Sequence, residues 1–280
     1  MATEQGSGDE HGGTWGSREV AGAWQRGSGA RVQAFGAATE EMLNLANVRT
    51  GGRVLDIAAG AGDQSLLAAR RVGPAGLVLA TDIAGSMLEL AAESARRAGL
   101  TNLRTRVMDA QDLDLKSDSF DAVICRFGLM LVPEPRKALA EAYRVLTPGG
   151  RLAAIVFSTP ENCPYISIPH AVARRVGRLT FRPDEFGEFR LSRPGVLEAA
   201  YRAVGFRDVA VHAVPTRYRF PSAAEAVEYA RALPVQELMA QLNEIEREHA
   251  WAEIEQELRQ FEGPDGYDSP CELLIGVGTK

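Results

Sequence analysis

Between residues 53 and 157, short apolar runs alternate with segments that carry a helical pattern of apolar residues. This alternation limits the possible folds more than any other feature of the chain. Most of the runs are continuously apolar, which is typical of parallel strands covered by helices on both faces. The expected strands are residues 53–57, 77–81, 103–107, 120–125 and 152–157. The pattern predicts an α/β fold with a doubly wound, mainly parallel sheet.

The helices between these strands have recognisable starting residues. Asp63 is placed to cap a helix over 63–72, and Ser86 is placed to cap a second helix that ends near Gly99. Pro135 is placed in the first turn of a third helix, where its missing N–H costs nothing. These starts support strand–helix–strand units rather than two separate blocks of strands and helices.

The rest of the chain divides around this core. Residues 1–17 are Gly, Ser and acidic residues with almost nothing apolar, so we expect a disordered tail. Residues 18–50 have helical spacing, and Gly27-Ser28-Gly29 suggests a break between two helices of an N-terminal cover. We expect residues 51–158 to form a ligand-binding core, and residues 159–280 to shape the substrate site and complete the sheet.

Within this last part, residues 158–193 show no clean period and are expected to be irregular. A helix over 194–204 and strands over 209–220 and 271–279 follow, which brings the sheet to seven strands.

Residues 222–262 are expected to be a helical insertion between the last two strands. Leu238 and Trp251 lie on opposite faces of one continuous helix, so either the helix breaks near 247–250 or it is buried on both sides. The insertion is either a lid over a ligand or a helical hairpin that extends the core.

The composition excludes several kinds of partner and site. The net charge of −6 argues against binding to nucleic acid or anionic membrane. Three cysteines and four histidines are scattered, which argues against a disulfide framework and a metal site. The N-terminus has no basic-then-apolar signal pattern, so we expect a cytoplasmic protein, a monomer or a homodimer, with a small-molecule substrate.

A glycine-containing turn follows the first expected strand. Gly60 and Gly62 allow a ligand to approach the backbone, and the next helix presents its N-terminus there. The third glycine of a nicotinamide-binding fingerprint is missing, because Ser65 stands at its position. The turn therefore predicts a ligand site but argues against a dinucleotide.

Three acidic residues lie at neighbouring strand ends: Asp56, Asp82 and Asp109. In an open α/β sheet, ligands bind beyond these carboxyl ends. Carboxylates there would repel a pyrophosphate but suit a cationic ligand with free ribose hydroxyls. S-adenosylmethionine, with a sulfonium, an ammonium and no phosphate, has this chemistry.

Five motifs in order then resemble one family. They are Val54-Leu55-Asp56-x-x-x-Gly60-x-Gly62, Ala80-Thr81-Asp82-Ile83 with Met87-Leu88, Met108-Asp109-Ala110, Ser119-Phe120-Asp121, and Arg144-Val145-Leu146-x-Pro148-Gly149-Gly150. Over residues 51–157 the chain resembles the class I S-adenosylmethionine-dependent methyltransferases, in particular the ubiquinone/menaquinone C-methyltransferases. The resemblance implies a Rossmann-like sheet. Ala58 departs from the family, where most members have glycine, and we expect a slightly tighter loop with binding retained.

The resemblance also implies roles for cofactor-binding residues. Asp56 would orient the loop and the methionine amino group, and Arg126 and Phe127 would wall the methionine end. The loop residues that would face the methionine moiety are Ala58, Gly60 and Gly62. Asp82 would hold the ribose hydroxyls. The residues that would contact the adenine are Ile83, Met87, Asp109 and Ala110.

Plainer interpretations stand beside these roles. The three aspartates could be helix caps or solvated loop acids, Met87 could be core, and Arg126 could be a surface ion-pair partner. Asp63 is interpreted as a cap rather than a ligand residue. Asp121, at the start of its strand, is interpreted as structural.

A dedicated base is optional for methyl transfer, because positioning supplies much of the acceleration. The candidates for a catalytic role are His170 and Tyr165, followed by Asp184 and Glu185. His212, in a predicted strand, and His249, on a predicted helix, are weaker. Aromatic residues suit an apolar acceptor pocket, and they are Tyr165, Phe181, Phe186 and Phe189. Trp24 and Phe35 could cover the cofactor or pack in the core.

The sequence thus predicts a methyltransferase that acts on a small, cyclic or aromatic acceptor, such as a secondary metabolite or a quinone. Two alternatives remain open. One is a nicotinamide-dependent oxidoreductase on the same fold. The other is a non-catalytic protein that binds S-adenosylmethionine.

Overall fold

The computed structural model describes residues 22, 28–180, 187–231 and 233–280. The expected disordered tail, Trp24, and the candidate residues Phe181, Asp184, Glu185 and Phe186 lie outside this part of the chain.

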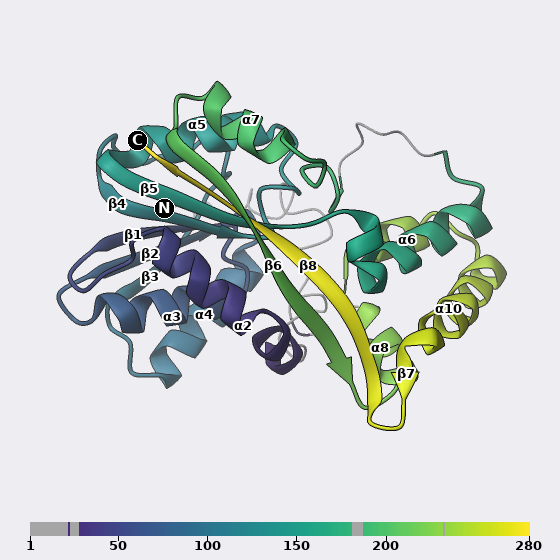
Figure 1. Cartoon of the computed structure of the whole chain (residues 1–280). Coiled ribbons are helices and arrows are strands. Elements are labelled where there is room, and N and C mark those ends of the chain that lie inside the picture. Colours follow the sequence, from purple (N-terminus) through teal and green to yellow (C-terminus); the bar gives the residue numbers. More distant parts are fainter. Residues whose placement is uncertain (1–21, 23–27, 181–186, 232) are drawn as a thin grey trace, which may run out of the picture.

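A single twisted sheet organises the molecule (Figure 1), with strand order β3-β2-β1-β4-β5-β8-β6 and the short β7 paired to β8. The strands are β1 (Arg53–Ile57), β2 (Leu77–Asp82), β3 (Leu103–Val107), β4 (Phe120–Arg126), β5 (Leu146–Phe157), β6 (Arg207–Phe220), β7 (Glu262–Gly263) and β8 (Gly266–Thr279). Strands β1 to β5 are parallel, and β8 runs antiparallel to both β5 and β6. The order reverses between β1 and β4, which is where such sheets bind ligands. The predicted fold class is confirmed.

Helices cover both faces of this sheet (Figure 1). On one face lie α2 (Ser28–Leu45), α3 (Asp63–Val72) and α4 (Gly85–Arg97), and on the other lie α5 (Pro135–Val145) and α7 (Val196–Ala203). The central strands β1 and β4 are almost entirely buried between these layers and carry core residues such as Leu55 and Ile124, whereas β3 and β6 are largely exposed. No helix in the described part of the chain is both long and apolar enough to cross a membrane.

A second group of helices gathers around the far ends of β6 and β8, which extend beyond the other strands (Figure 1). This group contains α6 (Pro164–Gly177), α8 (Ala223–Ala230), α9 (Val235–Met239) and α10 (Glu244–Leu258), together with the short 3₁₀ turns η2 (Pro160–Asn162) and η3 (Arg259–Phe261). Helix α6 packs against α10 and α9, and α8 packs against β6, β8 and α10. These helices therefore form one wall beside the carboxyl ends of β4 and β5.

Helix α6 corrects the expectation of irregular structure over 158–193. Pro164 occupies its first turn, and the buried side of the helix includes Tyr165, Ile166 and Val172. Pro169 lies inside the helix, where it removes one backbone donor. The two prolines concealed the helical pattern, because proline in a sequence is first interpreted as a breaker.

The helical insertion over 222–262 breaks earlier than the expected 247–250. Asn243 accepts a hydrogen bond from the Glu246 amide, while the Glu246 side chain accepts from the Asn243 amide, so a capping box starts α10. Trp251 is then buried, whereas Ile245 is 80% exposed on the outer face. The change of apolar face in the sequence therefore marks the start of a new helix.

Two expected caps are also corrected. Helix α3 has Gly62 as its N-cap, and Asp63 is its first helical residue. Helix α4 has Ala84 as its N-cap, and Ser86 lies inside the helix. The side chain of Asp82, at the end of β2, accepts hydrogen bonds from the backbone amides of Gly60 and Ala84, which lie just before these two helices.

Candidate functional site

The loop after β1 is built from left-handed backbone conformations. Gly60 and Gly62 have φ angles of 56° and 85°, a region that glycine enters without a steric cost. A Cβ on Gly62 would lie 2.8 Å from the Cβ of Ala91 in α4. The loop thus brings the N-terminus of α3 close to α4, and only glycine fits at position 62.

Ala58 is left-handed as well, with a φ of 53°. This conformation explains why glycine is favourable at such a position, since an alanine Cβ is strained there. Its methyl group lies against Gly128, just after β4: a Cβ on Gly128 would be 2.3 Å from the Ala58 Cβ. The absence of a side chain at Gly128 therefore makes room for Ala58.

Asp56 lies beneath the loop rather than among ligand-facing residues. Its side chain is fully buried and accepts hydrogen bonds from the Ser65 hydroxyl and, at 3.1 Å, from Gln64 Nε2. Burial raises the pKa of Asp56 to about 7, against the lowering effect of these hydrogen bonds. The structure thus corrects the expectation of three charged carboxylates in one hollow, because Asp56 anchors the loop from inside.

Asp82 connects three strand ends. Its carboxyl group accepts hydrogen bonds from the Gly60 amide at 2.8 Å and from the Ala84 amide at 2.9 Å. Its backbone carbonyl accepts from the amide of Met108, after β3, at 3.0 Å. Burial raises the pKa of Asp82, and the amide donors oppose this effect. A half-buried carboxyl therefore lies where β1, β2 and β3 end together.

The remaining adenine candidates lie near the ends of β2 and β3. Asp109 is half-buried and accepts from the backbone amide of Gln111 at 2.8 Å and from its side chain at 3.1 Å. Ile83 and Ala110 are half-buried, whereas Met87 is only 2% exposed. Met87 thus packs as a core residue, while the other three border the strand ends.

Arg126, at the end of β4, belongs to a buried ionic cluster. Its guanidinium donates to the Thr39 hydroxyl at 3.0 Å and to Asp63 Oδ2 at 3.2 Å. Arg31 of α2 donates to the same Asp63 oxygen at 2.9 Å. We call Arg31, Asp63 and Arg126 the Asp63 cluster. It is an ion-pair network, as one interpretation of Arg126 held, but it is buried rather than exposed.

Asp121 lies at the opposite end of β4 from this cluster. Its carboxyl group accepts from the Arg53 amide at 2.8 Å and so ties β4 to the start of β1. This contact agrees with its interpretation as a structural residue.

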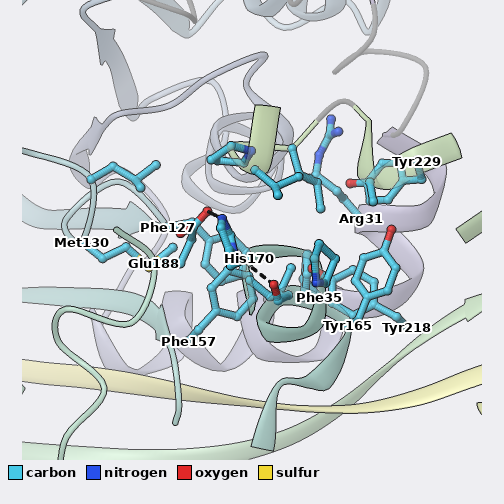
Figure 2. A pocket seen from close by; sticks show the side chains of 17 residues that line it. Arg31, Phe35, Phe127, Met130, Phe157, Tyr165, His170, Glu188, Tyr218 and Tyr229 are labelled. Atoms are coloured by element: carbon cyan, nitrogen blue, oxygen red, sulfur yellow. Dashed lines mark hydrogen bonds and ion pairs between the residues drawn. The ribbon is translucent and has the colours of Figure 1, made fainter. Parts of the chain in front are cut away.

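An aromatic pocket lies beside this cluster (Figure 2), past the carboxyl ends of β4 and β5. Its aromatic lining consists of Phe35, Phe127, Phe157, Tyr165, Tyr218 and Tyr229. The rings of Phe127 and Phe157 stack with centroids 4.6 Å apart, and Phe35 meets Phe127 edge-on at 4.8 Å. Together with the open solvent at its mouth, the pocket contains about 560 Å³ of empty space.

Both leading catalytic candidates, His170 and Tyr165, line this pocket from α6. The Tyr165 hydroxyl donates to the Ala226 carbonyl at 2.6 Å. Tyr165 therefore contributes its aromatic ring to the pocket wall, while its hydroxyl group is already hydrogen-bonded to the backbone. His170 Nε2 lies 3.3 Å from Oε1 of Glu188, a residue that sequence reasoning missed. No local sequence pattern marks Glu188, because its partner His170 lies 18 positions earlier in the chain.

The other candidates lie away from the pocket. His212 on β6 and His249 on α10 are exposed. Phe189 packs against Phe157 with ring centroids 6.4 Å apart, behind the lining residues.

Comparison with known proteins identifies the family of this chain. The profile of the ubiE/COQ5 methyltransferase family matches residues 37–176, half of the chain. The chain belongs to this family. The match begins in α2, includes every expected cofactor-binding residue and ends in α6. The predicted family of S-adenosylmethionine-dependent methyltransferases is therefore confirmed.

Individual relatives match over part of their length. A ubiquinone/menaquinone biosynthesis C-methyltransferase from Marinomonas sp. is 40% identical over 121 residues, which are 43% of this chain and 48% of the relative. A demethylmenaquinone methyltransferase from Listeria welshimeri is 39% identical over 125 residues, 45% of this chain and 52% of the relative. The chain thus spans about half the length of these relatives.

Among solved structures, phosphoethanolamine N-methyltransferase 2 of Haemonchus contortus, in complex with S-adenosyl-L-methionine, superposes with a TM-score of 0.62. The alignment covers all of this chain and 61% of that protein at 18% identity. This likeness supports the fold.

The contact between Ala58 and Gly128 gives a first prediction. We expect Gly128→Ala to destabilise the protein by about 1–3 kcal/mol, because the new methyl group overlaps the Ala58 methyl. In an Ala58→Gly background, most of this cost should disappear. Urea unfolding of the four proteins of this double-mutant cycle measures the coupling. Equal costs of Gly128→Ala in both backgrounds would show that the two methyl groups do not compete for space.

The raised pKa of Asp56 gives a second prediction. The folded protein holds the Asp56 proton up to about pH 7, whereas the unfolded chain releases it near its ordinary pKa of 3.8. The free energy of unfolding should therefore fall between about pH 4 and pH 7 and then level off. In Asp56→Asn this fall should be reduced, so the stability difference should grow in favour of the variant across the same range. A pH-independent difference in urea unfolding would contradict this interpretation.

Proposed function

We propose that this chain transfers the methyl group of S-adenosylmethionine to a small, apolar, cyclic or aromatic acceptor. One observation carries the proposal. The hydrogen bond from Gly60 to Asp82 joins the glycine loop to the end of β2, and the aromatic pocket begins on the other side of the same loop, at the Asp63 cluster. The proposed donor site and the proposed acceptor site would thus be neighbours at the switch point of the sheet.

The residues at the strand ends fit an adenosyl donor that carries positive charge. The carboxyl groups of Asp82 and Asp109 are half-buried and accept hydrogen bonds from amide groups. The nearby guanidinium of Arg126 is paired with Asp63. This donor and acceptor set suits ribose hydroxyls and an adenine amino group, and it gives little support to a pyrophosphate.

Each element would hold one part of S-adenosylmethionine. Asp82 would accept from the ribose hydroxyls, and Ile83, Asp109 and Ala110 would border the adenine, with Met87 packed behind it. The left-handed loop residues Ala58, Gly60 and Gly62 would face the methionine part, with Asp56 supporting the loop from beneath. The sulfonium supplies a methyl group whose bond to sulfur breaks as the bond to the acceptor forms.

The pocket would hold the acceptor by apolar and aromatic contacts. The stacked rings of Phe127 and Phe157 and the edge-on ring of Phe35 present flat apolar surfaces to a ring system. These residues come from α2, β5 and the turn after β4, which are rigid elements, so the acceptor would be held in one orientation. Such positioning supplies much of the rate acceleration of a methyl transfer.

Membership of a methyltransferase family weighs against a nicotinamide-dependent oxidoreductase. A non-catalytic protein that binds S-adenosylmethionine would share the donor site, and turnover with an acceptor distinguishes it. The cytoplasmic setting, the small-molecule partner and the monomeric or dimeric state stay predictions.

The donor site is tested by calorimetry. Asp82→Ala should weaken the binding of S-adenosylhomocysteine by about tenfold to a hundredfold, because one carboxyl group that accepts ribose hydroxyls is lost. Asp121→Asn, at the opposite end of β4 from the loop, is the matched control and should bind as the parent does. Parent-like binding by a folded Asp82→Ala would refute the proposed donor site, and circular dichroism of both variants checks the fold.

A further inference from the structure

Two ionisable side chains face each other in a pocket that is otherwise lined mainly by apolar and aromatic groups (Figure 2). His170 comes from α6, and Glu188 comes from the segment before α7. His170 Nε2 lies 3.3 Å from Glu188 Oε1, and the two side chains are 16% and 9% exposed. We call them the His170–Glu188 pair.

One hydrogen bond and one ionic contact of His170 bear on its protonation. Nδ1 lies 2.9 Å from the Ile166 carbonyl oxygen, and a carbonyl only accepts, so Nδ1 carries a proton. Nε2 faces a carboxylate, which favours a proton there as well. The charge of Glu188 raises the pKa of His170 against the effect of burial, and His170 in turn lowers the pKa of Glu188. The contact with Glu188 therefore favours the imidazolium form of His170, in which neither ring nitrogen has a free lone pair to act as a base.

Glu188 is the carboxylate in the pocket lining that is available to accept a hydrogen bond or a proton from a bound ligand. Among the described lining residues, it is the one side chain with a carboxyl group. The Tyr165 hydroxyl is committed to Ala226, and burial raises the pKa of this phenol well above its usual value. An ion pair with so little exposure costs solvation free energy that apolar side chains of the same size would avoid. Its place in a ligand pocket suggests a role in the chemistry.

We propose that Glu188 receives the hydrogen bond, and during transfer the proton, of the acceptor's nucleophilic group, and that protonated His170 is the positioning residue that holds Glu188. The inference rests on the proposed function. The acceptor's X–H bond breaks, its proton goes to the Glu188 carboxylate, and its electron pair bonds to the methyl carbon. The pair of the S–CH₃ bond stays on sulfur, which becomes a neutral thioether.

The charges around the pocket restrict the acceptor further. Arg31 lines the other side of the pocket and is paired with Asp63, which Arg126 also contacts. The pocket lining already contains two basic side chains, Arg31 and His170, and an ammonium group would add a further positive charge beside them. An uncharged molecule with a hydroxyl group therefore fits this site better than an amine.

Binding of two probes that differ in one hydrogen-bond donor tests the role of Glu188. The probes are 2-naphthol and its methyl ether, 2-methoxynaphthalene, each titrated by calorimetry into protein saturated with S-adenosylhomocysteine. The parent should prefer 2-naphthol by about fivefold to tenfold, as one hydrogen bond to a charged group allows. Glu188→Gln should bring this ratio close to one, and His170→Asn should lower it in part.

The ratio separates a direct role from a structural one, since a loosened pocket would weaken both probes alike. Glu198→Gln, which removes an exposed ion pair with Arg202, is the matched control and should keep the parent ratio. If Glu188→Gln does not fold, the double variant H170Q/E188Q removes both charges together, and it too should show a ratio near one.

An equal affinity of the parent for both probes, a lack of 2-naphthol binding, or an unchanged ratio in Glu188→Gln or in H170Q/E188Q overturns the proposal. If the parent fails to bind S-adenosylhomocysteine, the proposed function itself fails. The two failures are thus distinguishable in one series of titrations.

Discussion

The arrangement of the whole site depends on the carboxyl group of Asp82. It accepts from the amides of Gly60 and Ala84 at the same time, and so it fixes the loop after β1 to the start of α4. Left-handed glycines in that loop, and the buried Asp56 beneath it, make this approach possible. Because the Asp82 carboxyl group is hydrogen-bonded to the loop after β1, a ligand that contacts Asp82 would also lie against this loop.

The Asp63 cluster links the loop after β1 to the aromatic pocket. Asp63 follows the glycine loop directly, Arg126 ends β4, and Arg31 comes from α2 and reaches the pocket wall. Ion pairs thus connect the start of α3 with the end of β4 and with the wall of the aromatic pocket. The N-terminal helix is part of the site for the same reason.

Local patterns predicted the sheet well, because strand β1 and helix α3 carry their signals in consecutive residues. They failed where contacts join distant parts of the chain, or where the same residue type occurs in two different structural settings. Pro169 suggested a break but lies inside α6. Asp56 has the sequence signature of a ligand residue, yet packing turns it beneath the loop. Glu188 becomes visible only when folding places it opposite His170.

The account rests on a donor site that faces the aromatic pocket, and a crystal structure with S-adenosylhomocysteine tests this most directly. We expect the ribose hydroxyls within hydrogen-bond distance of the Asp82 carboxyl group, and the thioether sulfur directed toward the pocket between Phe35 and Phe127. A nucleoside bound away from Asp82, or a sulfur atom separated from the pocket by the chain, would contradict the account.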